Sequence, residues 1–341
     1  MATFTRFSSD DIVITTEKVF TNTWSDNTNA LTAATDETSS AQAVFTSPTS
    51  SGNYYIQVYN VADPDNAGGT PEVQYSISYG HKLGSGSEDI NDGAGAEGYN
   101  SSRAIYSQYR SLVFGDETRD FSFNGTAPDD IFIINVDRAR YKQSLRLGSL
   151  NLKIGTTNLT DDSVTNNGSA VLTNVGRQYN IVSGSSGVMS GSNLSQTDSG
   201  SYGLFYPDAG FIVLNAGAVS EDGNMSVTVT RGSDTANKNH QALLNGINAG
   251  AYFTLDTQEN ISSQFYFVRA KNKDFNYTTN PSFIDANGNL NFTSMVDNPV
   301  TYITTVGLYN DANELLAVAK LSQPITKDFT KEALIKVKLD Y

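Results

Sequence analysis

The chain has no cysteine among its 341 residues. This absence excludes disulfide bonds, thiolate metal sites and cysteine nucleophiles together. The fold must therefore depend on the burial of apolar surface and on hydrogen bonds. Folding in a reducing cytoplasm is expected.

Histidine is almost as scarce, since only His81 and His240 occur. Neither lies in a metal-ligand spacing such as H-E-x-x-H, and no segment has the G-x-S-x-G pattern of a serine hydrolase. A structural or solvent-exposed role is therefore favoured for both histidines. We expect no enzymatic activity, no catalytic residue, no cofactor and no metal ligand.

Basic residues are few: 22 Lys and Arg stand against 36 Asp and Glu, so the formal charge at pH 7 is −14. Such a surface repels phosphate backbones and anionic lipids, and no Lys/Arg cluster offers a basic face. No apolar run approaches the roughly 18 residues of a membrane span, and residues 1–10 lack the pattern of an export signal. We expect neither nucleic acid nor a membrane as a partner.

Aromatic residues and glycine are plentiful, with 18 Tyr, 17 Phe and 28 Gly. Apolar and polar residues alternate in Tyr54–Tyr59 and in Val73–Tyr79, which indicates two strands with one buried face each. Turn-favouring residues between them predict a hairpin with a long loop. The predicted fold is mainly β, an α+β chain with few short helices and β-sandwich-like domains built from antiparallel hairpins.

A polar, glycine-rich stretch at Gly84–Gly98 is the candidate linker between two domains. It would separate an N-terminal β-rich domain, residues 1–83, from a larger β-rich domain, residues 99–341. The larger domain begins with a helix predicted over Ser101–Phe114, capped by Ser101 or Ser102.

Further elements follow from the same patterns. The segment 156–200 is mostly Asn, Ser, Thr and Gly and predicts long surface loops with short strands between them. A short helix is predicted at Asn237–Ile247. Strands are predicted at Ile131–Val136, Leu150–Ile154, Phe211–Leu214, Met225–Thr230 and Phe265–Val268.

The C-terminal region carries the clearest hairpin, in which Tyr302–Leu308 and Leu315–Leu321 flank the polar tetrapeptide Asn310–Asn313. The last strand places four apolar side chains on one face, which predicts that this face is buried in a sheet; they are Ile335, Val337, Leu339 and Tyr341.

Three weaker patterns favour plain structural interpretations. Gly93, Gly95 and Gly98 spell G-x-G-x-x-G, but no apolar strand precedes them, so a flexible linker is favoured over a dinucleotide site. Asp285, Asn287 and Asn289 alternate as in a calcium loop, but the following glycine and the distal glutamate are missing, which favours a turn. The aromatic residues could form a sugar-binding platform, but most lie on predicted buried faces.

Five segments resemble virion structural proteins of T-even-like, contractile-tailed phages that infect cyanobacteria and marine bacteria. They are Tyr106–Asp116, Tyr202–Asp208, Phe275–Phe283, Tyr302–Asn310 and Leu316–Leu321. The resemblance covers about the last two thirds of the chain.

The resemblance implies a structural component of the virion, folded in the host cytoplasm and built into the baseplate wedge or the tail periphery. Its partners would be other baseplate and tail subunits and further copies of the chain in a homo-oligomer. A receptor-binding or carbohydrate-active tail fibre element is one alternative, and a head or neck decoration protein is another. The candidate interaction residues are Tyr106, Tyr109, Leu112, Ile335, Val337, Leu339 and Tyr341.

Overall fold

The structure is a computed structural model that describes residues 4–25, 55–59, 72–87, 100–166, 169–191, 194, 197–231, 239–250, 252–276 and 281–340. The chain forms two compact units. The central unit comprises residues 19–259, and the terminal unit comprises residues 1–18 together with residues 260–341. The chain crosses from one unit to the other within two strands, β1 (Ile12–Asn22) and β14 (Asp256–Ala270).

The central unit is built on an 11-stranded antiparallel sheet in the order β13-β6-β7-β9-β11-β12-β4-β3-β2, with β8 and β10 also paired to β9. A further short strand, β5 (Ser144–Leu145), pairs with β14. The strands of the sheet are β2 (Tyr55–Tyr59), β3 (Val73–His81), β4 (Asp130–Val136), β6 (Asn151–Ile154), β7 (Thr157–Asp161), β8 (Val171–Thr173), β9 (Gly176–Ser185), β10 (Val188–Met189), β11 (Gly203–Tyr206), β12 (Phe211–Asn215) and β13 (Tyr252–Thr254).

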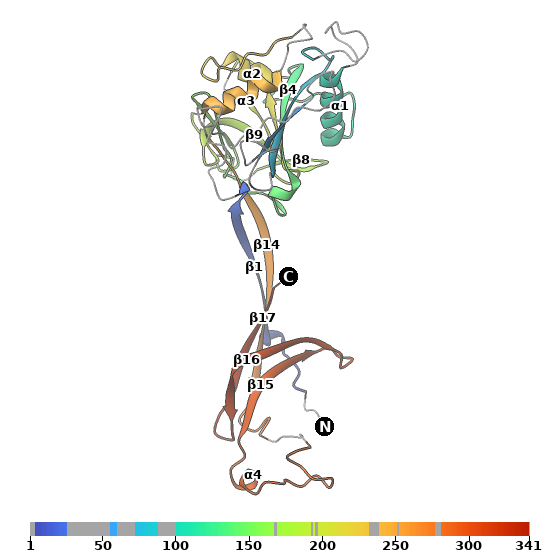
Figure 1. The fold of residues 1–341 in the computed structure, drawn as a ribbon, viewed down its shortest axis with the longest axis vertical. Helices are drawn as coiled ribbons and strands as arrows, with labels where there is room; N and C mark the ends of the chain where they lie inside the picture. The colour runs from blue at the N-terminus through green and yellow to red at the C-terminus, as the bar shows by residue number, and fades with distance from the viewer. Residues whose placement is uncertain are drawn as a thin grey trace. The chain divides into compact units, whose positions relative to one another are not determined.

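Helices cover both faces of this sheet (Figure 1). Helix α1 (Ser101–Phe114) packs on one face, whereas α2 (Ala216–Glu221) and α3 (Asn239–Gly250) contribute to the core on the other. Strand β4 shows the division directly, because Ile131 and Ile133 join the α1 core while Phe132 and Ile134 join the α3 core. A strand with two buried faces needs no polar alternation, which explains its unbroken apolar sequence.

Helix α1 begins as its sequence predicts but with a different cap. The Asn100 side chain accepts a hydrogen bond from the backbone N–H of Arg103 at 3.2 Å. The helix ends at Gly115, whose φ of 65° suits glycine. The predicted cap at Ser101 or Ser102 is therefore wrong by one or two residues. The Ser102 hydroxyl instead donates to the backbone oxygen of Ser85.

The terminal unit contains a sheet in the order β1-β14-β17 and a separate hairpin of β15 and β16. Its remaining elements are β15 (Thr301–Tyr309), β16 (Leu315–Lys327), β17 (Ala333–Asp340), the short helix α4 (Ser294–Asp297) and the 3-10 turn η1 (Ser9–Asp11). The Asn310 side chain closes the hairpin turn by accepting from the backbone N–H groups of Ala312 and Glu314.

The mainly β prediction with few short helices is confirmed. The hairpin of β2 and β3, the hairpin of β15 and β16, and the last strand all form where the sequence predicts them. The helix expected at Asn237–Ile247 is α3, Asn239–Gly250.

The division of the chain differs from the expected one. Strand β3, in the predicted N-terminal domain, pairs along its length with β4 of the predicted larger domain, so both belong to one sheet. Gly84–Gly86, at the start of the expected linker, are buried within the central unit. Residues 88–98 lie outside the described residues. Glycine-rich composition marks turns as readily as linkers, and it cannot show which strands pair across it.

Two local predictions differ from the structure. The segment 156–200 has the short strands that were expected between its loops, but β9 is ten residues long and pairs with β7, β8, β10 and β11. Met225–Thr230 forms no strand, although Met225 and Val227 are buried in the core. In both segments, tertiary packing overrides the local pattern.

Candidate interaction surface

The two histidines belong to the interior of the central unit. His81 is 4% exposed, and its Nδ1 accepts a hydrogen bond from the backbone N–H of Leu83 at 3.1 Å. His240 is 5% exposed and lies in the first turn of α3. Within the described residues, no group of three or more His, Asp or Glu side chains is arranged to hold a metal ion.

An ion pair between the exposed Arg231 and the buried Asp130 lies beside a hollow of about 310 Å³ in the central unit. Asp130 is 2% exposed and accepts hydrogen bonds from Arg231 Nε at 2.7 Å and from the Tyr79 hydroxyl at 3.2 Å. The carboxylate raises the pKa of Arg231, and burial raises the pKa of Tyr79. Two donors thus compensate the burial of Asp130, and this pairing ties β3 and β4 to the chain after α2.

Two adjacent carboxylates are buried at the end of β7. Asp161 accepts from the backbone N–H of Gly148 and from the Ser163 hydroxyl, and Asp162 accepts from the backbone and side-chain N–H groups of Asn180. Burial raises the pKa of both groups above the ordinary value. Because their partners are neutral donors within the central unit, these carboxylates fasten neighbouring loops to the sheet.

An open cleft of about 680 Å³ lies between β7, β9 and β10. Hydroxyl and amide groups dominate its lining, which contains no charged and no aromatic side chain. The lining residues are Thr156, Thr157, Asn158, Ser183, Gly184, Ser185, Val188, Met189, Ser190 and Asn224.

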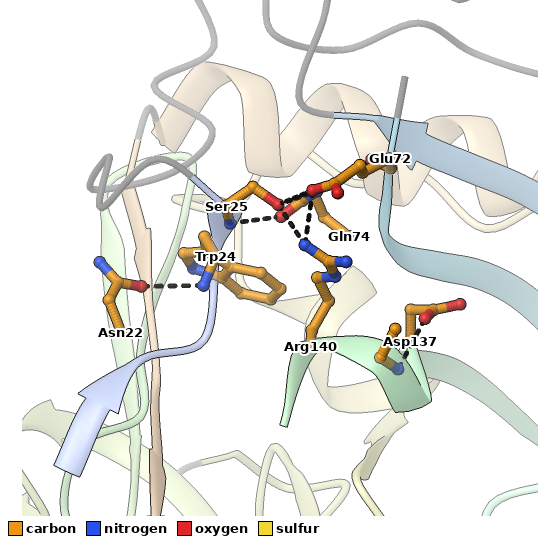
Figure 2. A network of polar contacts seen from close by, with 8 residues as sticks. Asn22, Trp24, Ser25, Glu72, Gln74, Asp137 and Arg140 are labelled. Carbon is orange, nitrogen blue, oxygen red and sulfur yellow. Dashed lines mark hydrogen bonds and ion pairs between the residues drawn. The ribbon is translucent and has the colours of Figure 1, made fainter. Parts of the chain in front are cut away.

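The chain segment that follows β1 is anchored in the central unit by Trp24. Trp24 is 2% exposed, and its indole packs edge-on against Phe253 and at a tilt against Tyr75. The indole Nε1 donates to the backbone oxygen of Phe253 at 2.8 Å. The backbone N–H of Trp24 donates to the Asn22 side chain at 2.9 Å, as Figure 2 shows.

A polar network continues from this anchor (Figure 2). The backbone N–H of Ser25 donates to Gln74 at 2.9 Å, and its hydroxyl donates to Glu72. Arg140, in the 3-10 turn η3 (Arg138–Arg140), pairs with Glu72 at 2.7 Å. The Ser25 hydroxyl, followed by the Arg140 charge, lowers the pKa of Glu72. These contacts fix residues 22–25 and identify the network as a structural anchor.

The terminal unit has a small core. Counted over the described residues, its hydrophobic cluster has four buried members, Val306, Leu308, Ile335 and Val337, whereas the two clusters of the central unit have 31 and ten. A unit of about a hundred residues with so few buried side chains gains little stability from its own interior.

Exposed apolar side chains are concentrated on this same unit. Of the 24 large hydrophobic side chains exposed in the described parts of the chain, 15 belong to the terminal unit. They include Ile14, Tyr302, Leu316, Val318 and Leu334, each at least 59% exposed. Clustered exposure of this kind marks surfaces that contact other molecules.

Charge is distributed unequally between the units. The terminal unit has 10 basic and 11 acidic residues, for a formal charge of −1, and the central unit has 12 basic and 25 acidic residues, for −13. Self-repulsion is therefore weak on the unit with the exposed apolar side chains.

The strands of the terminal unit also present open edges. Within the described residues, β1 and β17 each pair only with β14, and β15 and β16 pair only with each other. Unpaired strand edges are templates for β-sheet pairing with another chain.

The candidate interaction residues separate into distinct environments. Tyr106 is 0% exposed, so its selection as a surface contact is wrong: its ring packs against Phe121 on the sheet-facing side of α1. Tyr109 is half-buried, with its ring 5.3 Å from that of Phe211. Leu112 is 49% exposed on the outer side of the helix.

Ile335 and Val337 are buried in the core of the terminal unit, as predicted for the last strand, and Leu339 is partly buried beside them. They stabilise the sheet from inside and are not free for a partner. Tyr341 lies outside the described residues.

Sequence reasoning missed the outer face of the hairpin. Leu316 and Val318 are 68% and 59% exposed, and the Tyr309 ring lies over Gly307 on the same face. The sequence feature that could have indicated this exposed face is the run Leu315–Ala319, which is apolar at every position. A strand with only one covered face normally alternates apolar and polar residues.

The calcium-like spacing at Asp285 forms a turn. Asp285 Oδ1 accepts from the backbone N–H groups of Asn287 and Asn289, and Gly288 has a φ of 83°. The G-x-G-x-x-G triplet at Gly93, Gly95 and Gly98 lies outside the described residues.

Among the described residues, no helix is both long and apolar enough to cross a membrane. Comparison of the chain with protein-family models, curated proteins and solved structures finds no match in any of the three.

Proposed function

We propose that this chain is a structural assembly protein whose terminal unit docks onto neighbouring subunits. The observation that carries the proposal is the concentration of exposed apolar side chains and open strand edges on the unit with the smaller core. Burying one large apolar side chain contributes about 1.5–3 kcal/mol, so several such contacts suffice to hold a subunit in an assembly.

The particle we propose is the virion of a contractile-tailed phage, with this chain in the baseplate wedge or at the tail periphery. The resemblance of residues 106–116, 202–208, 275–283, 302–310 and 316–321 to virion structural proteins supports this choice. Two of these segments, 302–310 and 316–321, fall on β15 and β16 of the terminal unit. The proposed partners are other baseplate and tail subunits and further copies of the chain.

The fibre alternative has one feature in its favour, the hydroxyl-rich cleft between β7, β9 and β10. Glycan sites usually combine such polar groups with an aromatic ring on which a sugar stacks, and glycosidases add paired carboxylates. The cleft lining has neither. We therefore place the assembly role ahead of receptor binding. A head or neck position would use the same docking surface in another part of the particle.

The test is incorporation of variants into particles when the chain is supplied in place of the wild type. Leu316→Asp places a charge on the outer face of β16, and Leu172→Asp makes the same change on β8 of the central unit, where Leu172 is 80% exposed. We expect particles to lose the first variant and to retain the second. Equal incorporation of two folded variants would contradict docking through the terminal unit.

A further inference from the structure

Strand β16 presents an open sheet edge, and its pairing with β15 is regular from Ala317 to Lys320, between an irregularity at Leu316 and a second one before Ile325. One of its sides pairs with β15, and no strand in the described parts of the chain pairs with the other. Natural edge strands carry charges, prolines or bulges that prevent pairing with foreign strands. In β16 these are the irregularity at Leu316 and Pro324, and between them Leu315–Ala319 is five apolar residues in succession, with Glu314 directly before it and Lys320 directly after it.

The outer face of β16 presents these residues in a simple order. Leu316, Val318 and Lys320 point outward and are exposed, whereas Ala317, Ala319 and Leu321 pack against the core of the terminal unit. Glu314 is exposed at the turn end of the strand. Along the strand, the order is thus acidic, apolar, apolar, basic.

When a second copy of the strand lies antiparallel to the first, this order of side chains places opposite charges and apolar residues opposite one another. If Leu316 lies opposite Val318 of an antiparallel copy, the same register places Glu314 opposite Lys320, and both pairs occur twice. We infer that β16 pairs edge to edge, antiparallel, with β16 of a second copy in this register. The result is a continuous four-stranded sheet across a two-fold axis at Ala317. The inference rests on the proposed assembly function and names one partner for it.

Two further features fit this register. Pro324, which lacks a backbone N–H, would lie opposite position 310 in the hairpin turn and thus beyond the paired stretch. Lys320 faces Thr305 across the hairpin, and its ammonium group pairs with no carboxylate among the described residues. A second copy would supply that carboxylate from Glu314.

The charge balance favours a second copy over an acidic or basic partner. A unit at −1 has little self-repulsion, and the only charges at the proposed edge are one of each sign. A strongly acidic partner would place like charges beside Glu314, and a strongly basic one would place them beside Lys320; either repulsion weakens binding.

Charge reversal tests the pairing in solution, using the purified full-length chain and sedimentation equilibrium over a concentration series. Glu314→Lys and Lys320→Glu each place like charges opposite one another at two symmetry-related positions. We expect each to raise the dissociation constant of the dimer roughly tenfold or more. The double variant restores both pairs with their signs exchanged, so its dissociation constant should return close to that of the wild type.

Matched controls change the same charges elsewhere. Lys142→Glu and Glu117→Lys alter exposed residues of the central unit and should leave the dissociation constant unchanged. Far-UV circular dichroism and thermal unfolding of every variant separate loss of pairing from loss of fold.

A cysteine variant tests the register, because the natural chain has no cysteine. Ala317→Cys lies opposite itself in the second copy, at a separation that a disulfide can span, so mild oxidation should cross-link the dimer. Ala319→Cys, which would lie opposite Leu315, should remain uncross-linked.

A wild-type chain that stays monomeric at micromolar concentration and above overturns the inference. So does a double variant as weak as the single ones, and the exposed edge would then face a different protein. This failure is distinguishable from failure of the proposed function. A monomeric chain found in purified particles contradicts only the pairing, and a dimeric chain missing from particles contradicts only the assembly role.

Discussion

Removal of the Trp24 indole should destabilise the central unit strongly, because Trp24 is its anchor at the end of β1. Trp24→Ala deletes a side chain that is 2% exposed, its ring contacts with Tyr75 and Phe253, and the hydrogen bond to the Phe253 carbonyl. Large-to-small changes of buried aromatic residues cost about 3–5 kcal/mol. Trp24→Phe retains a ring in the site but removes the hydrogen bond to the Phe253 carbonyl, so a smaller cost of about 1–2 kcal/mol is expected.

Urea unfolding followed by far-UV circular dichroism measures these costs. Trp24 is the only tryptophan, so its fluorescence in the wild type identifies the transition of the central unit. Leu172→Ala serves as a control, since Leu172 is 80% exposed and its truncation should change the free energy of unfolding by less than about 0.5 kcal/mol. If Trp24→Ala cost under about 1 kcal/mol, the side chain would not be the anchor described above.

Three further changes test the turn geometry and the buried charges. Gly155→Ala should lower the unfolding free energy by at least about 1 kcal/mol, because φ is +56° and a Cβ would lie 2.2 Å from the Asn224 carbonyl oxygen. Gly223→Ala is the control, since a Cβ there meets no other atom, and equal effects of the two changes would refute the argument. Burial raises the pKa of Asp161 in the folded state above 3.8. The stability of the wild type relative to Asp161→Asn should therefore fall as pH rises from about 3.8 through the folded pKa. If urea titrations showed a stability difference between the two proteins that stayed flat or rose with pH, this explanation would be wrong. The hydrogen bonds from Arg177 lower the pKa of Asp208 in the folded state. Asp208→Asn should therefore cost stability at pH 7, and this cost should disappear as pH falls below the folded pKa of Asp208. A cost that is independent of pH in urea titrations would contradict a stabilising ion pair.

Local patterns predicted the elements whose signals are complete within a short segment. The α1 helix has its apolar stripe and its glycine stop within 15 residues, and the β15–β16 hairpin has an apolar-rich segment on each side of a polar turn. The full length of β9 could not be predicted in the same way. Its polar sequence is stabilised by pairing with four other strands, and none of that pairing is visible in its own residues.

The division into units depends on pairing between strands that are far apart in the chain, so it could not be predicted from local sequence patterns. Residues near the N-terminus and the last 82 residues form one unit because β1, β14 and β17 share a sheet, although β1 and β17 lie at opposite ends of the chain. The candidate surface was found only in part. The C-terminal strands were expected to dock, but the apolar row singled out in β17 is the buried one, and the exposed row lies on β16.

The most direct test of the assembly role is quantitative mass spectrometry of purified particles. The chain should be present at a fixed ratio to the major tail protein in every fraction of the particle band, and washing with salt should not lower that ratio because apolar contacts persist at high ionic strength. A chain that stays in the lysate and is missing from purified particles would contradict the proposed function.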